Sequence, residues 1–217
     1  MTLPGVFQPR GDARLLAAAM RERGLARGAR VLDVFSGSGV LALAAAREGA
    51  REVVAVDVSR RAIASVRINA RRDGVADRVR ARRGDLLAAV AGERFDLILA
   101  NPPYVPSPRE ALPRRGAARA WEGGADGRAL IDRLCDAAPA ALAPGGTLLL
   151  VQSSLCDEQA TLRRLADAGL DGERAAARRG PLGPLMRERA ELLRARGLLA
   201  DGGEHEELLV LAARAPR

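Results

Sequence analysis

The chain alternates between short apolar segments and longer segments in which apolar residues recur at helical spacing. Each apolar segment is short enough to be a strand buried on both faces of a sheet. The clearest of them is Phe95 to Ala100, which reads Phe-Asp-Leu-Ile-Leu-Ala. The pattern predicts strands over residues 30–35, 52–57, 79–83, 95–100, 147–152, 173–179 and 206–212.

The segments between these strands have the periodicity of amphipathic helices. Near the N-terminus, Leu15, Leu16, Ala19 and Met20 share one face, and Asp12 is a suitable N-cap. The same reasoning predicts helices over residues 12–23, 40–47, 59–71, 126–142, 157–168 and 185–196, and a short helix that begins at residue 85.

Alternating strands and helices predict an α/β fold built from right-handed βαβ units, with a mostly parallel sheet and helices on both faces. The last two strands suit an antiparallel pair at one edge. Because 217 residues can form one core and no linker divides the chain, we expect a single domain over residues 1–217 with an N-terminal helical segment at 1–29. Residues 105–125 lack periodicity and are rich in Pro, Gly and Arg, which predicts a functional loop.

The composition of the chain limits how its core is built and in which compartment it is expected. Hydrophobic residues make up 48% of the chain but aromatic residues only 2%, so Ala, Leu and Val must build the core. No apolar run approaches the length of a membrane span, and the first residues lack the features of a signal peptide. Cys135 and Cys156 lie in separate apolar segments, which favours a reducing cytoplasm. The chain has one histidine, His205, which we interpret as a surface residue, and histidine–cysteine spacing of a zinc site is absent.

The formal net charge of +8 points toward an anionic partner. However, every cationic side chain is Arg, which indicates a compositional bias, and the arginines are spread along the whole chain. Affinity for nucleic acid therefore stays open. The predicted loop carries Arg109, Arg114, Arg115 and Arg119, which are either solvated charges or part of a substrate-gating segment.

Polar residues follow four successive predicted strands. They are Asp33, Asp57, Asp85 and Asn101, and the turn Ser36-Gly37-Ser38-Gly39 follows the first strand. Carboxyl ends of parallel strands meet at one edge of the sheet, where open α/β sheets bind ligands. Each residue taken alone is also a plausible turn or N-cap residue. Four such residues at four successive strand ends indicate a binding site.

The tetrapeptide Asn101-Pro102-Pro103-Tyr104 ends the fourth strand. Pro102 keeps Asn101 extended, and neither proline donates to a ladder. The Asn101 side chain and the Pro102 carbonyl offer two acceptors, and Tyr104 offers a flat face. This combination suits a planar NH2 group.

This arrangement resembles the class I S-adenosylmethionine-dependent methyltransferases, whose fold is Rossmann-like and seven-stranded. The resemblance implies that Asp33 faces the methionine end of the cofactor, Gly37 and Gly39 form its floor, Asp57 holds the ribose and Asp85 the adenine. It also implies cofactor contacts from the neighbouring residues and from the fourth strand end, namely Phe35, Ser36, Val58, Leu86 and Asn101. The product is then S-adenosylhomocysteine, and no metal takes part.

A narrower resemblance rests on Asn101-Pro102-Pro103-Tyr104, which is the motif of methyltransferases that act on planar nitrogens. Together with Trp121 to Gly127 and Leu142 to Gly146, it is similar to the HemK-like release-factor glutamine methyltransferases, in their short, single-domain branch. The resemblance implies a peptide chain release factor as substrate. It also allows lysine methylation and a small zinc-binding activator. One departure is that Gln8 to Ala13 keeps only the Pro and Asp of that branch's Glu-Pro-x-x-Asp-Thr segment.

Three alternatives stay open. The nearest is a nucleic-acid methyltransferase that uses the same motif on an adenine or guanine amino group. An NAD-dependent oxidoreductase would leave the segment Asn101–Tyr104 without a role and would need an acid–base pair that the sequence does not offer. A protein that binds the cofactor without transferring methyl groups is the third.

Overall fold

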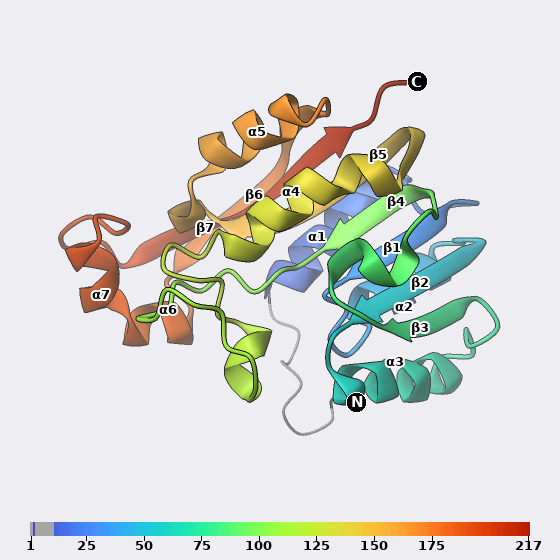
Figure 1. Cartoon of the computed structure of the whole chain (residues 1–217), viewed down its shortest axis with the longest axis horizontal. Helices are drawn as coiled ribbons and strands as arrows, with labels where there is room; N and C mark the ends of the chain where they lie inside the picture. Colours follow the sequence, from blue (N-terminus) through green and yellow to red (C-terminus); the bar gives the residue numbers. More distant parts are fainter. Residues whose placement is uncertain (1, 3–10) are drawn as a thin grey trace.

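The computed structural model describes residue 2 and residues 11–217, in which seven strands form one sheet (Figure 1). The strand order is β3-β2-β1-β4-β5-β7-β6. The predicted helix near residue 12 is present, whereas the part of the N-terminal segment at residues 1 and 3–10 lies outside the described residues. The strands are β1 (Arg30–Val34), β2 (Glu52–Asp57), β3 (Val79–Arg83), β4 (Phe95–Ala100), β5 (Leu142–Ser153), β6 (Asp171–Pro181) and β7 (His205–Arg214).

The sheet confirms the predicted mostly parallel α/β fold. Strands β1 to β5 pair in parallel, while β7 pairs antiparallel with both β5 and β6. The last two strands therefore form the expected antiparallel pair at the edge. The later strand, β7, inserts between β5 and β6, because its apolar run Leu208 to Ala213 suits the more buried position.

Helices cover both faces of the sheet and complete two separate apolar layers. One layer contains α1 (Gly11–Glu22), α2 (Val40–Arg47) and α3 (Arg60–Arg72). The other contains α4 (Ala129–Ala141) and α5 (Glu158–Asp167), and Figure 1 shows these two helices together on one side of the sheet. Successive residues of a strand point to opposite faces of the sheet, so Val31 packs in the first layer and Leu32 in the second.

Some boundaries differ from those the sequence predicts. Helix α4 starts at Ala129 rather than 126, because Gly124 and Gly127 adopt positive φ and form a turn in front of it. Strand β5 already begins at Leu142, so the predicted helix stop at Pro144–Gly146 lies inside the strand segment. The predicted helix over 185–196 is two short helices, α6 (Pro184–Glu188) and α7 (Ala190–Ala195).

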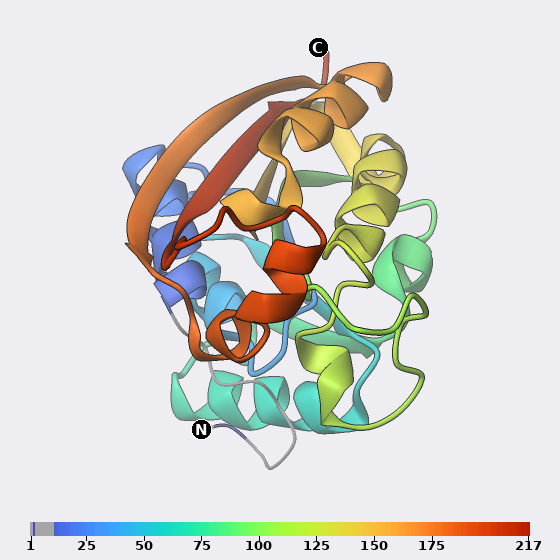
Figure 2. The same cartoon turned by 90° about the vertical axis from the view of Figure 1, so that its left-hand side faces the viewer.

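Helices α6 and α7 lie between β6 and β7 in the chain and pack against the loop that follows β4 (Figure 2). Val105, Leu182, Met186, Leu193 and Leu199 form a third, smaller apolar cluster there. Guanidinium groups reinforce it: Arg196 donates to the carbonyl oxygens of Ser107 at 2.6 Å and Ala125 at 2.5 Å. Contacts with α6 and α7 hold residues 105–125 in place, although the one regular element in this loop is the 3₁₀ turn Ala117–Ala120.

None of the described helices is long and apolar enough to cross a membrane.

Candidate active site

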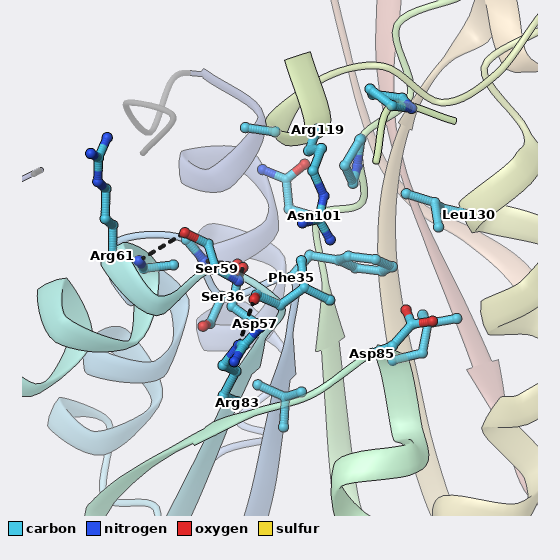
Figure 3. Close-up of a pocket in the computed structure, with 18 of the residues that line it drawn as sticks. Phe35, Ser36, Asp57, Ser59, Arg61, Arg83, Asp85, Asn101, Arg119 and Leu130 are labelled. Atoms are coloured by element: carbon cyan, nitrogen blue, oxygen red, sulfur yellow. Dashed lines mark hydrogen bonds between the residues drawn. The ribbon is translucent and has the colours of Figure 1, made fainter. Parts of the chain in front are cut away.

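The carboxyl ends of β1, β2, β3 and β4 surround a cavity of about 920 Å³ (Figure 3). The β1 turn, the start of α3, the segment after β3 and the loop over residues 112–120 all contribute to its wall. The cavity therefore lies where the sequence predicts a ligand. The predicted site residues that line it are Phe35, Ser36, Gly37, Asp57, Val58, Asp85, Leu86, Asn101 and Pro103.

Asp33, at the end region of β1, is fully buried beneath the turn and is not among the lining residues. Its Oδ2 accepts from the backbone N–H of Ala42 at 3.0 Å, whereas Oδ1 has no partner in the described part of the chain. Burial raises the pKa of this carboxyl from 3.8 to about 8, against the lowering effect of the Ala42 hydrogen bond. The structure thus places Asp33 behind the cavity wall.

Asp57 organises two neighbouring segments of the cavity wall. Its Oδ2 accepts from the backbone N–H of Gly37 at 3.0 Å, and its Oδ1 accepts from that of Ser59 at 2.8 Å. Burial raises its pKa, while these hydrogen bonds and the charge of Arg119 act in the opposite direction. A carboxylate has about four lone-pair positions, so Asp57 can still accept from a diol.

Two non-glycine residues of the wall adopt positive φ, namely Phe35 at 61° and Leu86 at 49°. Such conformations cost about 1–3 kcal/mol each and persist where the surrounding structure imposes them. Both residues follow an aspartate-bearing strand end and line the cavity. Gly39 has a packing role instead: a Cβ there would lie 3.1 Å from a methyl group of Val66, so this glycine lets α2 approach α3.

Asp85 lies at the far side of the cavity from the β1 turn in Figure 3 and is exposed. Its Oδ2 accepts from the Arg133 guanidinium at 2.8 Å. Because both side chains are about half exposed, this ion pair is weak and can open for a ligand.

Asn101 ends β4 and lines the cavity together with Pro103. Within residues 11–217, neither the Asn101 side chain nor the Pro102 carbonyl receives or makes a hydrogen bond. Tyr104 points elsewhere: its hydroxyl donates to Asp12 Oδ2 at 3.2 Å, and its ring contacts two apolar clusters. Two of these four residues, Asn101 and Pro103, line the cavity, whereas Pro102 and Tyr104 are not among the lining residues.

The segment Trp121 to Gly127 before α4, here called the glycine segment, packs directly on the backbone of the tetrapeptide Asn101–Tyr104. A Cβ added at Gly123 would lie 2.6 Å from the Pro103 carbonyl oxygen, and one at Gly127 would lie 2.3 Å from that of Tyr104. Only glycine allows this approach. The isolated bridge between Val105 and Glu122 continues the contact. The glycine segment and the tetrapeptide Asn101–Tyr104 therefore form one packed unit.

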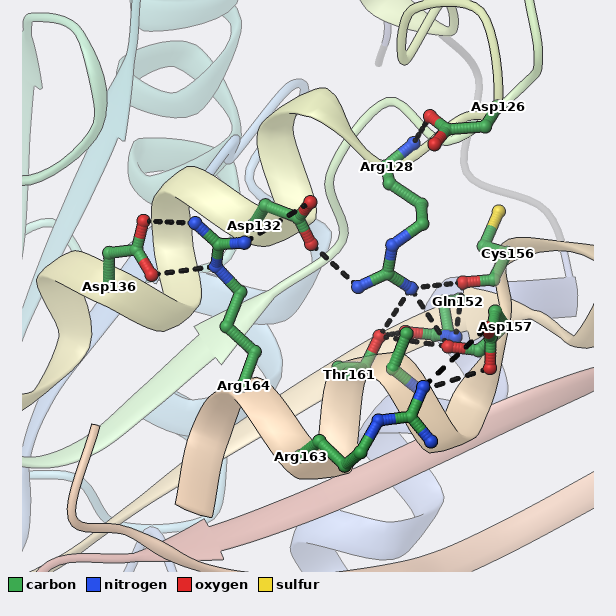
Figure 4. A network of polar contacts seen from close by, with 11 residues as sticks. Asp126, Arg128, Asp132, Asp136, Gln152, Cys156, Asp157, Thr161, Arg163 and Arg164 are labelled. Carbon is green, nitrogen blue, oxygen red and sulfur yellow. Dashed lines mark hydrogen bonds and ion pairs between the residues drawn. The ribbon is translucent and has the colours of Figure 1, made fainter. Parts of the chain in front are cut away.

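Arg128 anchors the glycine segment to the rest of the molecule (Figure 4). Its guanidinium donates to the carbonyl oxygens of Cys156 and Asp157 and to Thr161 Oγ1, and it pairs with Asp132 at 2.6 Å. The Arg128 side chain is only 11% exposed. A buried guanidinium with several acceptors fixes the start of α4, the helix from which Leu130 lines the cavity.

Sequence reasoning missed part of the site. Glu122 lines the cavity and is held by Arg189 at 2.6 Å and by Ser107 at 3.1 Å. Of the loop arginines, Arg114, Arg115 and Arg119 line the cavity, whereas Arg109 does not. The Glu122 contacts link segments far apart in the sequence, so no local pattern could have revealed them.

The residues present suit S-adenosylmethionine. Ser36 lines the cavity, and its Oγ is a buried polar atom without a partner in the described part of the chain, which is unusual unless a ligand or water completes it. Asp57 can accept from ribose hydroxyls, and Asp85 from an adenine amino group. The described residues contain no cluster of histidine, cysteine or carboxylate groups that could hold a metal ion.

Comparison with known proteins identifies the family of the chain. Residues 1–112 match the family described as Methyltransferase small domain. Over 183 residues the chain is 32% identical to the Methanocaldococcus jannaschii protein named "Putative protein N5-glutamine methyltransferase", covering 84% of this chain and 90% of that protein. Over 157 residues it is 37% identical to the release factor glutamine methyltransferase of Geobacter sulfurreducens, covering 68% of this chain but only 53% of that protein. The chain thus spans about half the length of this second relative.

Solved structures show the same fold. The E. cuniculi Mtq2–Trm112 complex, responsible for methylation of the termination factor eRF1, matches with a TM-score of 0.65 and 23% identity over 97% of this chain and 99% of that chain. The 16S rRNA N2 G1207 methyltransferase of T. Thermophilus, in complex with AdoMet and guanosine, matches with a TM-score of 0.61 and 25% identity over 99% of this chain and 46% of that chain.

Proposed function

Because the chain belongs to the methyltransferase small domain family, we propose that it transfers a methyl group from S-adenosylmethionine to the side-chain amide nitrogen of a protein glutamine. The proposed substrate is a peptide chain release factor, in keeping with the names of the relatives. The proposed site residues are Asn101, Pro102, Pro103 and Tyr104 for the acceptor, and Asp33, Phe35, Ser36, Gly37, Gly39, Asp57, Val58, Asp85, Leu86 and Asn101 for the cofactor.

One observation carries the proposal. The Asn101 side chain and the Pro102 carbonyl have no hydrogen-bond partner among residues 11–217, although they lie at the edge of a cavity lined by Asn101 and Pro103. Buried or half-buried acceptors are normally satisfied. Two neighbouring acceptors at the end of one strand match the two N–H groups of a carboxamide.

When bound, S-adenosylmethionine supplies an electrophilic methyl group on a sulfonium. The chain itself must align the amide nitrogen, because amide resonance makes that nitrogen a poor nucleophile. The Asn101 Oδ1 and the Pro102 carbonyl accept the two N–H groups and fix the plane of the amide. Both acceptors also stabilise the positive charge that develops on nitrogen, so they act most strongly in the transition state.

The rest of the wall limits motion and water. Phe35, Pro103 and Leu130 are apolar residues that line the same cavity as Asn101. Asp57 keeps the β1 turn and the start of α3 together through its two backbone hydrogen bonds. Proximity and orientation of this kind supply much of the rate in a transfer that needs no nucleophilic side chain. The N-protonated product amide is a strong acid and loses its proton to water after transfer, so no strong base is required.

The test is transfer of labelled methyl groups from S-adenosylmethionine to purified release factor. A matched substrate in which the glutamine of the Gly-Gly-Gln sequence is replaced serves as control. Label on the natural factor and none on the replaced one supports the proposal. Equal label on both factors, or label on neither, contradicts it.

A nucleobase amino group is the second candidate acceptor, and a specific observation favours it: seven arginines line the cavity against three acidic residues. Adenine and guanine amino groups are planar and could use the same two acceptors. Bulk RNA and DNA therefore belong in the same assay. Label on nucleic acid alone would identify the chain as a nucleic-acid methyltransferase and leave the proposed cofactor site unchanged.

A small zinc-binding activator, and lysine as acceptor, stay predictions that the same assay can address. The Mtq2 structure is a complex with Trm112. Among the described residues, Val40 is the one exposed large hydrophobic residue, and it lines the cavity. The chain should therefore first be assayed alone.

A further inference from the structure

Exposed arginines gather around the mouth of the cavity, on segments that are far apart in the sequence. Five of them form what we call the arginine rim: Arg60 and Arg61 at the start of α3, and Arg114, Arg115 and Arg119 on the loop after β4. Figure 3 shows Arg61 and Arg119 on two sides of the opening. The other two lining arginines have partners, since Arg83 donates to the Val58 carbonyl and Arg133 to Asp85.

Most of the rim lacks intramolecular charge compensation. In the described part of the chain, no carboxylate forms an ion pair with Arg60, Arg114 or Arg115. Arg119 acts on the half-buried Asp57 through its charge, which lowers the pKa of that carboxyl against the larger, raising effect of burial. Several like charges around one opening repel one another, so their gathering costs free energy unless a ligand compensates it.

Neither the cofactor nor a glutamine provides that compensation. S-adenosylmethionine carries a net positive charge, from a sulfonium and an ammonium against one carboxylate, so the rim opposes its approach. A glutamine side chain is neutral. The anionic groups that the rim fits must therefore belong to whatever surrounds the acceptor.

The rim has the character of a phosphate-binding surface rather than of a protein interface. Protein interfaces are also rich in arginine, but they combine it with a buried centre of aromatic and apolar anchors. Here the lining loop offers only Leu112 and Pro113 as larger apolar groups, and Phe35 is the single aromatic residue of the described lining. Guanidinium groups without stacking partners bind a phosphodiester backbone by charge and hydrogen bonds.

We propose that the arginine rim binds the phosphodiester backbone of RNA next to the methyl acceptor, so that the chain modifies its glutamine within an RNA–protein assembly. This inference rests on the proposed function for the choice of RNA, because a translation factor meets RNA at its site of action. Recognition is independent of base sequence and falls steeply with salt.

The test is the anisotropy of a fluorescent oligouridylate, titrated with the full chain at several salt concentrations. Uracil has no exocyclic amino group, so the probe reports backbone binding and cannot itself accept a methyl group at such a nitrogen. The variant is Arg114→Gln/Arg115→Gln. Its matched control is Arg71→Gln/Arg72→Gln, an adjacent exposed pair at the opposite end of α3 from Arg60.

We expect the rim variant to bind the probe roughly tenfold more weakly or worse at 0.1 M salt. The slope of log K against log salt should fall by about 1.4, since each single-strand phosphate contact contributes about 0.7. The control pair should change neither value by more than a small amount. Equal weakening by both pairs would mean diffuse attraction by the net charge and would overturn the proposal.

Polyglutamate supplies a second arm. Competition by polyglutamate as strong as that by oligouridylate, at equal charge, would assign the rim to an acidic protein and overturn the RNA assignment. The result is also separable from the proposed function. Failure to label release factor would contradict glutamine methylation, yet it would leave the anisotropy of the probe unchanged.

Discussion

Charged groups at the two ends of the parallel strands β1 to β5 have opposite environments. We call the amino ends of these strands the amino edge of the sheet and their carboxyl ends the carboxyl edge. At the amino edge, Arg30 pairs with Glu52 at 2.7 Å and with Glu93, and its backbone N–H donates to Asp96 at 2.8 Å. Arg82 adds a second guanidinium to Glu93. At the carboxyl edge, Asp33 keeps one oxygen without a partner in the described chain, and the Asn101 side chain makes no hydrogen bond there.

The pKa directions follow the same division. Hydrogen bonds from Arg82 and Arg30 lower the pKa of Glu93, whereas burial raises the pKa values of Asp33 and Asp57. Acids at the amino edge are therefore compensated by the protein itself. Acids at the carboxyl edge are held at a cost in free energy, as expected where a ligand completes the site. Changes at the carboxyl edge should accordingly alter transfer or binding, and changes at the amino edge should alter stability alone.

The largest effect is expected for Asn101→Ala. Removing one preorganised group that stabilises developing charge typically lowers a rate constant by about 10²–10³-fold. We expect a single-turnover transfer rate reduced by about that factor, because only the Pro102 carbonyl remains to orient the amide. Cofactor affinity, measured in parallel by titration calorimetry, should change only slightly. Retention of most of the transfer rate would remove Asn101 from the mechanism.

Gly127→Ala should have the next largest effect. Its Cβ would lie 2.3 Å from the Tyr104 carbonyl oxygen, and φ is 81°, so the Asn101–Tyr104 segment must move. We expect about 2–4 kcal/mol of lost stability in urea unfolding and a reduced transfer rate. Gly74→Ala is the matched control, because φ is 68° there but no atom lies within 4 Å. It should lose only about 1 kcal/mol. Similar losses in both variants would show that crowding against Tyr104 is unimportant.

The third prediction concerns the pH dependence of stability that Asp33 causes. The unfolded carboxyl ionises near its ordinary pKa of 3.8, and the folded one near 8. Between these values the folded protein binds more protons than the unfolded chain, so its free energy of unfolding falls as pH rises, by up to about 1.4 kcal/mol per unit. Asp33→Asn should flatten this slope between pH 5 and about 8 in urea titrations. An unchanged slope would show that Asp33 is ionised throughout.

Much of the fold followed from local pattern. The strand ends at Asp57 and Ala100, the helix at Gly11–Glu22 and the mostly parallel sheet were all predictable, because apolar runs and turn residues mark them in sequence. The insertion of β7 between β5 and β6 was not, since pairing order depends on contacts between distant segments. Helix α4 began later than expected because the turn at Gly124 and Gly127 serves the packing of another loop.

The sequence predicted which residues at the strand ends belong to the site, but it did not predict the directions of their side chains or the loop residues around them. Asp57, Asp85 and Asn101 line the cavity as expected, because the end of a parallel strand has a known position. A strand end does not, however, decide the direction of a side chain. Asp33 therefore turned out to lie behind the wall, and the Tyr104 hydroxyl was found on Asp12. The gathering of the arginine rim depends on tertiary structure and left no local signal.

The most direct measurement compares the two ends of one strand. Titration calorimetry with S-adenosylhomocysteine should be run on the unmodified chain, on Asp57→Asn at the carboxyl end of β2 and on Glu52→Gln at its amino end. We predict that Asp57→Asn weakens binding by roughly 30- to 100-fold, about 2–3 kcal/mol. Glu52→Gln should leave affinity unchanged while lowering the unfolding midpoint. Equal affinities for all three proteins, or weaker binding by Glu52→Gln alone, would contradict the assignment of the carboxyl edge as the cofactor site.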